Sequence, residues 1–276
     1  MISIPVYQVD AFTDECFKGN PAAVCLLDNE LDDHIMQAIA AEMNLSETAF
    51  VYSLENKPIP RSTHFSLRWF TPKVEVPLCG HATLATAAVL FSEQQLDTNE
   101  IMFETLSGKL IAKKEENCIL LDFPSNPPER MEPPEELLKA LGIKSYQNIV
   151  NSHSAGKLLI HLENEDAVKT VKPDFECMKN LPMYQGIIGV IVTSKGAPPF
   201  DFISRFFAPW VGVNEDPVTG SAHTVLTPYW SEVLGKSEMV AFQASARGGK
   251  LIVRLEGDRV NLLGEAVIVV KGELVL

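Results

Sequence analysis

The stretch "NEDPVTGSAHT", residues 214–224, places two acids, a proline, a Thr-Gly turn and a Ser-Ala-His run directly before a segment with helical character. It resembles a phosphate-binding loop but lacks the lysine and the glycine spacing of one. A related phrase, "LCGHATLA" at residues 78–85, occurs about half a chain earlier. In both places a glycine, Gly80 or Gly220, leads onto the start of a helix. The recurrence suggests that the chain contains a duplication.

Two further pairs of motifs support this interpretation. "RWFTP" at 68–72 is matched by "RFFAP" at 205–209, and "FETLSGKLIA" at 103–112 by "FQASARGGKLIV" at 242–253. Each match alone could arise by chance, but matched landmarks in one order at a similar offset are typical of a repeat. We therefore expect one domain at 1–121, completed by a C-terminal strand at about 264–276, and a second at 122–263. The Pro-rich segment 122–138 is the expected link.

The predicted elements follow one plan in both halves. Short β-branched or alternating runs such as "AFVYSL" and "GIIGVIVTS" are typical of strands. Residues 31–44 have the pattern of an amphipathic helix. The segment from His81 is apolar on nearly every face through Phe91, which predicts a helix buried on all sides. Its counterpart carries Pro228, which should kink it, and ends at Gly235. The expected fold class is α+β, with each domain a β-barrel-like sheet around a central buried helix.

Composition and the absence of certain motifs exclude several classes of function. The 276-residue chain is 46% hydrophobic and 21% charged, with a formal net charge of -13. An acidic chain argues against a nucleic-acid or anionic-membrane partner. Its five cysteines form no CxxC pair, so neither a disulfide framework nor a zinc site is indicated. We find no Rossmann fingerprint, P-loop or metal-ligand cluster in the sequence, and expect no cofactor and no metal. No apolar run is long enough to span a membrane, and we expect a cytoplasmic protein.

The two matched helix starts favour the binding of an anion. The first N–H groups of a helix lack internal partners, and the helix dipole makes that end positive. A substrate carboxylate would accept hydrogen bonds from these N–H groups and would be attracted by the positive end of the dipole. If the halves pack about a pseudo-twofold axis, both helix starts would face one cleft. The alternative is two ordinary capped helices. His81 follows Gly80 as Ser221 follows Gly220, so the repeat maps His81 onto Ser221. Because the start of a helix disfavours a positive charge, we expect the imidazole of His81 to be neutral. Asp216 precedes Pro217 and could act as a cap.

Five motifs together resemble the PhzF-like family of phenazine biosynthesis. They are "GNPAAV" (19–24), "NLSETAF" (44–50), "RWFTP", "LCGHATLA" and "NEDPVTGSAH", and the resemblance covers nearly the whole chain. It implies a duplicated, two-domain diaminopimelate-epimerase-like fold with the active site in the cleft between the domains. It also implies a homodimer.

The resemblance further implies a catalytic acid/base at Glu47. We expect apolar neighbours such as Leu45 and Phe50 to raise the pKa of its carboxyl group toward neutrality. His81 and Asp216 are the other implied catalytic residues; with Ser221 they would hold and polarise the substrate. Asn20 could lie at the rim of the site or belong to a structural turn. The residues assigned to substrate binding are Asn20, Gly80, Thr219, Gly220 and Ser221.

The predicted function is a cofactor-independent isomerase that moves a proton within a small carboxylate-bearing substrate. Two alternatives stay open. The first is an amino-acid racemase or epimerase that uses two opposed cysteines. Cys79 has the position of one of them, but its repeat partner is Thr219, which cannot ionise to serve as a base. The second is a catalytically silent binding or scaffold protein.

Overall fold

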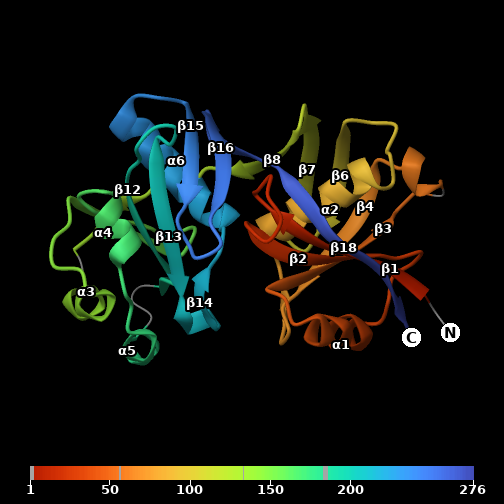
Figure 1. The fold of residues 1–276 in the computed structure, drawn as a ribbon, viewed down its shortest axis with the longest axis horizontal. Coiled ribbons are helices and arrows are strands. Elements are labelled where there is room, and N and C mark those ends of the chain that lie inside the picture. Colours follow the sequence, from red (N-terminus) through yellow and green to blue (C-terminus); the bar gives the residue numbers. More distant parts are fainter. Residues whose placement is uncertain (1–2, 56, 133, 183–185) are drawn as a thin grey trace. The chain divides into compact units, whose positions relative to one another are not determined.

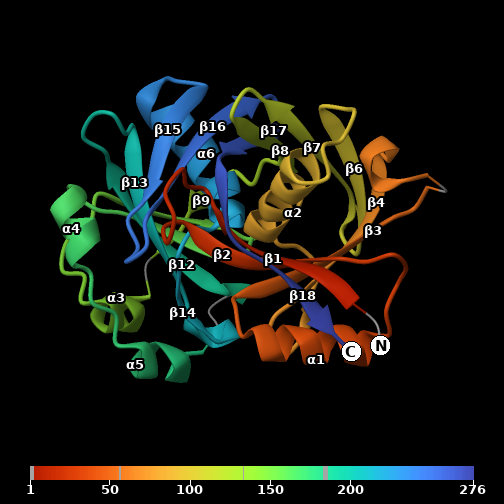
Figure 2. The same ribbon diagram turned by 45° about the vertical axis from the view of Figure 1, so that its right-hand side comes forward.

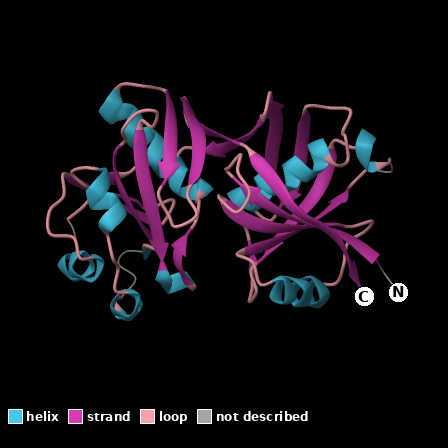
Figure 3. Ribbon diagram, viewed as in Figure 1, coloured by secondary structure: helices cyan, strands magenta, loops and turns pink. Residues whose placement is uncertain are grey.

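The computed structural model describes residues 3–55, 57–132, 134–182 and 186–276, and the chain divides into two compact units. The first comprises Met1–Asp122 and Leu263–Leu276, and the second Phe123–Leu262. Each unit consists mainly of strands that enclose one long helix, as Figure 3 shows by secondary structure. Among the described residues, no helix is long and apolar enough to cross a membrane.

The first unit is drawn in red to yellow and dark blue in Figures 1 and 2. Its elements are β1 (Ser3–Ala11), β2 (Asn20–Leu26), α1 (Asp33–Met43), β3 (Glu47–Ser53), η1 (Ile59–Arg61), β4 (His64–Phe70), β5 (Glu75–Val76), α2 (Gly80–Ser92), β6 (Glu100–Thr105), β7 (Gly108–Glu115), β8 (Cys118–Pro124) and β18 (Ala266–Val275). Strand β18 returns the C-terminus to this unit by pairing antiparallel with β1.

The second unit is drawn in green to blue. Its elements are β9 (Glu129–Arg130), α3 (Glu135–Leu141), β10 (Asn148–Ser152), β11 (Lys157–His161), α4 (Glu165–Thr170), α5 (Phe175–Asn180), β12 (Gly189–Lys195), β13 (Phe202–Ala208), η3 (Pro209–Val211), β14 (Val213–Asp216), α6 (Gly220–Leu234), β15 (Glu238–Gln243), β16 (Gly249–Glu256) and β17 (Arg259–Gly264).

The strand pairings establish the duplication. In the first unit β1–β2 is antiparallel, β2–β3 parallel, β3–β4 antiparallel, β4–β6 parallel and β6–β7 antiparallel. In the second unit β10–β11, β11–β12, β12–β13, β13–β15 and β15–β16 repeat that alternation. The repeated arginines behave alike as well. Arg68 binds Glu75 through two nitrogens at 2.7 and 2.8 Å, and Arg205 binds Glu215 at 2.7 and 3.0 Å.

Helix α2 forms the centre of the first unit. Every residue from His81 to Phe91 is buried, as the sequence predicted, and the helix contacts β1, β2, β3, β7 and β18. Helix α1 packs elsewhere in the same unit through Met36, Ile39 and Ala40, and ends at Asn44 in the left-handed conformation. Because the strands hold α2 along its length, the position of its first turn is fixed by the core.

Helix α6 has the same place in the second unit and contacts β11, β15 and β16. It continues through Pro228 and ends at Gly235. Proline has no N–H to donate to the carbonyl of Thr224, four residues earlier. That carbonyl instead accepts the backbone N–H of Asn126 at 3.0 Å. The proline is therefore compatible with a helix in the core, because the segment around Asn126 satisfies the released acceptor.

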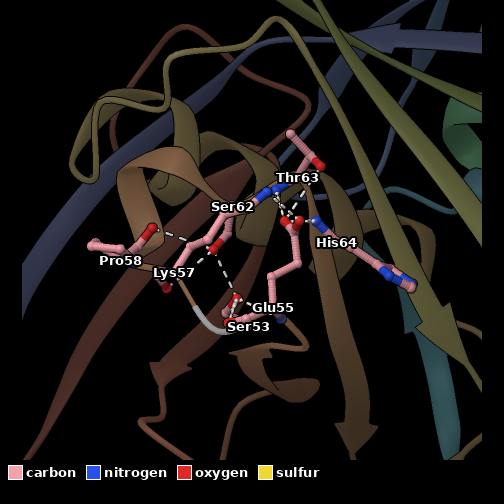
Figure 4. A network of polar contacts seen from close by, with 7 residues as sticks. All are labelled: Ser53, Glu55, Lys57, Pro58, Ser62, Thr63 and His64. Atoms are coloured by element: carbon pink, nitrogen blue, oxygen red, sulfur yellow. Dashed lines mark hydrogen bonds and ion pairs between the residues drawn. The ribbon is translucent and has the colours of Figure 1, made fainter.

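The connection between β3 and β4 is closed by Glu55 (Figure 4). Its carboxylate accepts the backbone N–H of Thr63 at 2.6 Å and that of His64 at 3.3 Å, while Lys57 donates to it at 2.6 Å. These donors, with the hydrogen bond from Lys57 first, lower the pKa of Glu55 to about 2. The carboxylate thus stays ionised at neutral pH and fixes the loop.

Candidate active site

The starts of two strands and one helix bring three predicted residues together in the first unit. Asn20 begins β2 and Glu47 begins β3, and the parallel register places Ala22 opposite Glu47. Helix α2 begins at Gly80 and contacts both strands. Parallel strands end at a common edge of the sheet, so the side chains at their starts lie close to the first turn of the helix.

His81 lies at the centre of this group, and its two ring nitrogens have different neighbours. Nδ1 lies 3.2 Å from the amide nitrogen of Asn20 and 3.5 Å from Sγ of Cys79. Nε2 lies 3.2 Å from Oε2 of Glu47, a contact within ion-pair distance that is not aligned as a hydrogen bond. An amide N–H can only donate, so Nδ1 is the acceptor and the proton of the neutral ring lies on Nε2. The imidazole therefore presents an N–H toward Glu47.

The protonation of His81 follows from its burial. The side chain is only 6% exposed, and burial lowers its pKa to about 3. The ring is thus uncharged at neutral pH, as the sequence predicted for a histidine at a helix start. Glu47 keeps 17% of its side-chain surface exposed. Glu47 is therefore the more accessible member of the pair, with the histidine behind it.

Glu47, Cys79 and His81 offer ligand atoms that lie within 4.8 Å of one another, a group that could hold a metal ion. Cys79 is near Nδ1 of the ring, whereas Glu47 is near Nε2. In the structure, Nδ1 of the neutral imidazole has the Asn20 amide and the Cys79 thiol as neighbours, and Nε2 lies close to the Glu47 carboxylate.

The second unit contains a polar network at the matching helix start. Asp216 ends β14, and its Oδ2 accepts the hydroxyl of Thr219 at 2.5 Å. Gln243, which ends β15 and is fully buried, donates to the backbone carbonyl of Asp216 at 2.8 Å and to the Thr219 hydroxyl at 3.1 Å. Its Oε1 accepts the backbone N–H of Thr219 at 2.9 Å. The loop that precedes α6 is therefore fixed on both sides of Pro217.

Gly220 and Ser221 form the first turn of α6, and Thr219 makes no side-chain cap for that helix. Ser221 is partly exposed, whereas His223, one turn further on, is fully buried. Its Nδ1 donates to the carbonyl of Thr219 at 2.8 Å, and burial lowers its pKa to about 4. A neutral histidine thus supports the helix start in this unit too. The roles of Asp216, Gly220 and Ser221 toward a substrate stay predictions.

Sequence reasoning missed two parts of these groups. Asn20 is not at a rim: it is fully buried and donates to His81. Gln243 was overlooked, although the repeat contains a signal for it. The "FE" of the first half, Phe103-Glu104, corresponds to "FQ", Phe242-Gln243, in the second. The exchange of an acid for an amide at a buried strand end suggests a hydrogen-bonding role, since an amide both donates and accepts.

Comparison with known proteins identifies relatives over nearly the whole chain. The profile of the family described as "Phenazine biosynthesis-like protein" matches residues 9–272. A human phenazine biosynthesis-like domain-containing protein is 49% identical, with 99% of each chain covered. An uncharacterized isomerase from Halalkalibacterium halodurans is 48% identical, with 100% of each chain covered. Both similarities cover nearly the whole chain and therefore both units.

Solved structures extend the comparison to the fold. A PhzF-family phenazine biosynthesis protein from Enterococcus faecalis has a TM-score of 0.91 at 43% identity, with 100% of both chains covered. A hydroxyproline epimerase from Agrobacterium vitis shares the fold alone, with a TM-score of 0.59 at 10% identity over 99% of this chain and 92% of that one. The duplicated fold is thus of the diaminopimelate-epimerase-like type. The chain belongs to the family of phenazine biosynthesis-like proteins.

Proposed function

We propose that this protein is an isomerase in which Glu47 takes a proton from one carbon of a small carboxylate-bearing substrate and returns it to another. The family, the isomerase named among the relatives and the epimerase fold support an isomerase or epimerase type of activity. Moving a proton within one molecule leaves its overall oxidation state unchanged. Such a reaction balances without an external oxidant or reductant, and no cofactor is included in the proposal.

The observation that carries the proposal is the contact between Glu47 and a neutral His81. A charged imidazolium would form an ion pair with the carboxylate and weaken it as a base. Burial keeps the ring uncharged, so its Nε2 can lie 3.2 Å from the carboxylate without neutralising it. Asn20 in turn holds the ring in the tautomer that has its N–H at Nε2. We therefore assign Glu47 as the acid/base, and His81 as the residue that positions it.

Substrate binding is the second part of the proposal. Asp216 is a carboxylate fixed by Thr219, and it suits a polar N–H or O–H of the substrate. The first turn of α2 and the first turn of α6 each present backbone N–H groups of the kind that suits a carboxylate. Donors aimed at that carboxylate would also stabilise the enolate-like charge that develops when the C–H proton leaves. Ser221, partly exposed on the first turn of α6, is the proposed hydroxyl donor.

Solvent exchange tests the acid/base role directly. Small amino-acid-derived acids that raise the melting temperature of the protein are incubated with it in D2O, and deuterium incorporation is followed by mass spectrometry. Glu47→Gln keeps the size and hydrogen-bonding capacity of the side chain but cannot accept the proton. We expect the exchange rate to fall by about 10²–10⁴-fold, the usual contribution of a general base, while ligand-induced stabilisation persists.

A matched control is Glu42→Gln, which alters an exposed glutamate on α1 of the same unit. This variant should exchange like the wild type. Undiminished exchange in Glu47→Gln would show that another group removes the proton. Acids that bind but never exchange in the wild type would contradict an isomerase and favour a binding protein.

A further inference from the structure

A buried lysine lies in the second unit and has no part in the chemistry described so far. Lys157 begins β11 and is 5% exposed, although lysine is seldom buried without a partner. Its Nζ donates to the carbonyl of Ala155 at 3.1 Å, and within residues 3–55, 57–132, 134–182 and 186–276 we find no second acceptor for it. An ammonium group has three donors, so this site does not satisfy the group by hydrogen bonds alone.

An aromatic ring provides the second contact. Nζ of Lys157 lies 5.7 Å from the centroid of the Phe206 ring, within the range of a cation–π attraction. The ring reaches the lysine because of Gly189, which pairs with Lys157 across β11 and β12. A Cβ on Gly189 would lie 2.3 Å from Cζ of Phe206. The ring of Phe206, on β13, therefore crosses β12 over a residue that has no side chain.

The same ring connects the lysine to the candidate site. Phe206 is the register partner of Asp216 across β13 and β14. Burial lowers the pKa of Lys157 to about 8, and the negative charge of Asp216 opposes that decrease. The ammonium consequently stays mostly charged at neutral pH and interacts electrostatically with the Asp216 carboxylate. The attraction is mutual, so the ammonium favours the ionised form of that carboxylate.

We infer that Lys157 supports Asp216 electrostatically: its buried ammonium, which lies over the ring of Phe206, favours the ionised form of the Asp216 carboxylate on the neighbouring strand. The inference rests on the proposed role of Asp216 in substrate binding. Lys157 acts through Asp216 and is not proposed to touch the substrate. Thr219 and Gln243 fix the loop by hydrogen bonds, whereas Lys157 supplies the positive charge that those neutral groups cannot supply.

The coupling is measurable on the protein alone, without a substrate. The carboxyl ¹³C resonance of Asp216, assigned with Asp216→Asn, is titrated by NMR in the wild type and in Lys157→Met, which keeps a long side chain but has no charge. We expect the midpoint for Asp216 to rise by roughly 0.5–1, less than the shift produced by a directly paired charge. Lys157→Arg should restore the wild-type midpoint. Lys169→Met, which alters a lysine on α4 that pairs with Glu165, is the matched control and should change nothing.

The reciprocal titration keeps the inference falsifiable if Lys157→Met does not fold. In Asp216→Asn the Lys157 ammonium loses the nearby negative charge, so its pKa should fall below the value of about 8 that it has in the wild type. The ¹³C resonance of the lysine ε-carbon reports this pKa. Unchanged midpoints in either experiment would overturn the inference. If both midpoints shift but Asp216→Asn leaves deuterium exchange intact, the charge coupling stands and the proposed role of Asp216 in the reaction fails. A third outcome is that both midpoints shift and that deuterium exchange falls in Asp216→Asn and in Lys157→Met but not in Lys157→Arg. This outcome would support both the charge coupling and the proposed role of Asp216 in the reaction.

Discussion

Two buried neutral histidines should make this protein lose stability in mild acid. His81 in the first unit has a pKa of about 3 and His223 in the second a pKa of about 4, against an ordinary value of 6.5. Between pH 6.5 and those values the unfolded chain binds a proton on each ring that the folded chain does not bind. Stability therefore decreases as the pH falls through this window.

The size of the effect follows from these pKa values. One pH unit of differential protonation corresponds to about 1.4 kcal/mol at 25 °C. Between pH 8 and pH 5 each histidine is expected to cost about 2 kcal/mol of unfolding free energy, because both folded pKa values lie at or below 4. Their sum, about 4 kcal/mol, is a large part of the 5–15 kcal/mol that stabilises a typical domain. Carboxylates contribute little here because most of them titrate below about pH 5.

The assay is urea denaturation at pH 8, 7, 6 and 5, with His81→Gln and His223→Gln beside the wild type. Each variant lacks one titrating ring, so its free energy should change by about 2 kcal/mol less across the range. Burial also lowers the pKa of His161, which adds to the slope in all three proteins and cancels in the comparison. A variant that kept the full pH dependence would refute the claim that its histidine is buried and neutral.

Three further variants, with Gly272→Ala as a control for one of them, test the packing and the chemistry of the site. Cys79→Ala should leave deuterium exchange nearly unchanged, because the thiol faces the imidazole; a two-thiol racemase would lose its activity. Asn20→Ala removes the buried amide that donates to that ring, and should lower the unfolding free energy in urea by about 1–3 kcal/mol. Gly189→Ala places a methyl group 2.3 Å from Phe206 and should cost about 1–3 kcal/mol, whereas Gly272→Ala, whose nearest atom would lie at 3.9 Å, should be tolerated.

The sequence was sufficient for the fold because the duplication repeats short, local signals. Glycine before a helix, an arginine in "RWFTP" and "RFFAP", and a helix apolar on every face are all readable without knowing which strands pair. The contact of Asn20 with His81 was not readable in this way. It depends on the parallel register of β2 with β3 and on the packing of α2 against both strands, which are long-range features. The same holds for Lys157, whose neighbours come from three other strands.

The strand registers of the two units show which residue of the second unit corresponds to Glu47, the proposed acid/base. Arg68 lies opposite Phe50, and Arg205 lies opposite Val192. Phe50 on β3 therefore corresponds to Val192 on β12. Glu47 precedes Phe50 by the same number of residues as Gly189 precedes Val192, so the counterpart of Glu47 is Gly189.

The ring of Phe206 requires a residue without a side chain at that position, so the second unit cannot carry a carboxyl group there. The counterpart of Cys79 is Thr219, which is no base either. Two-base racemisation needs ionisable groups contributed by both halves, and neither equivalent position of the second half provides one. The asymmetry is consistent with the proposed reaction, in which one carboxyl group both removes and returns the proton.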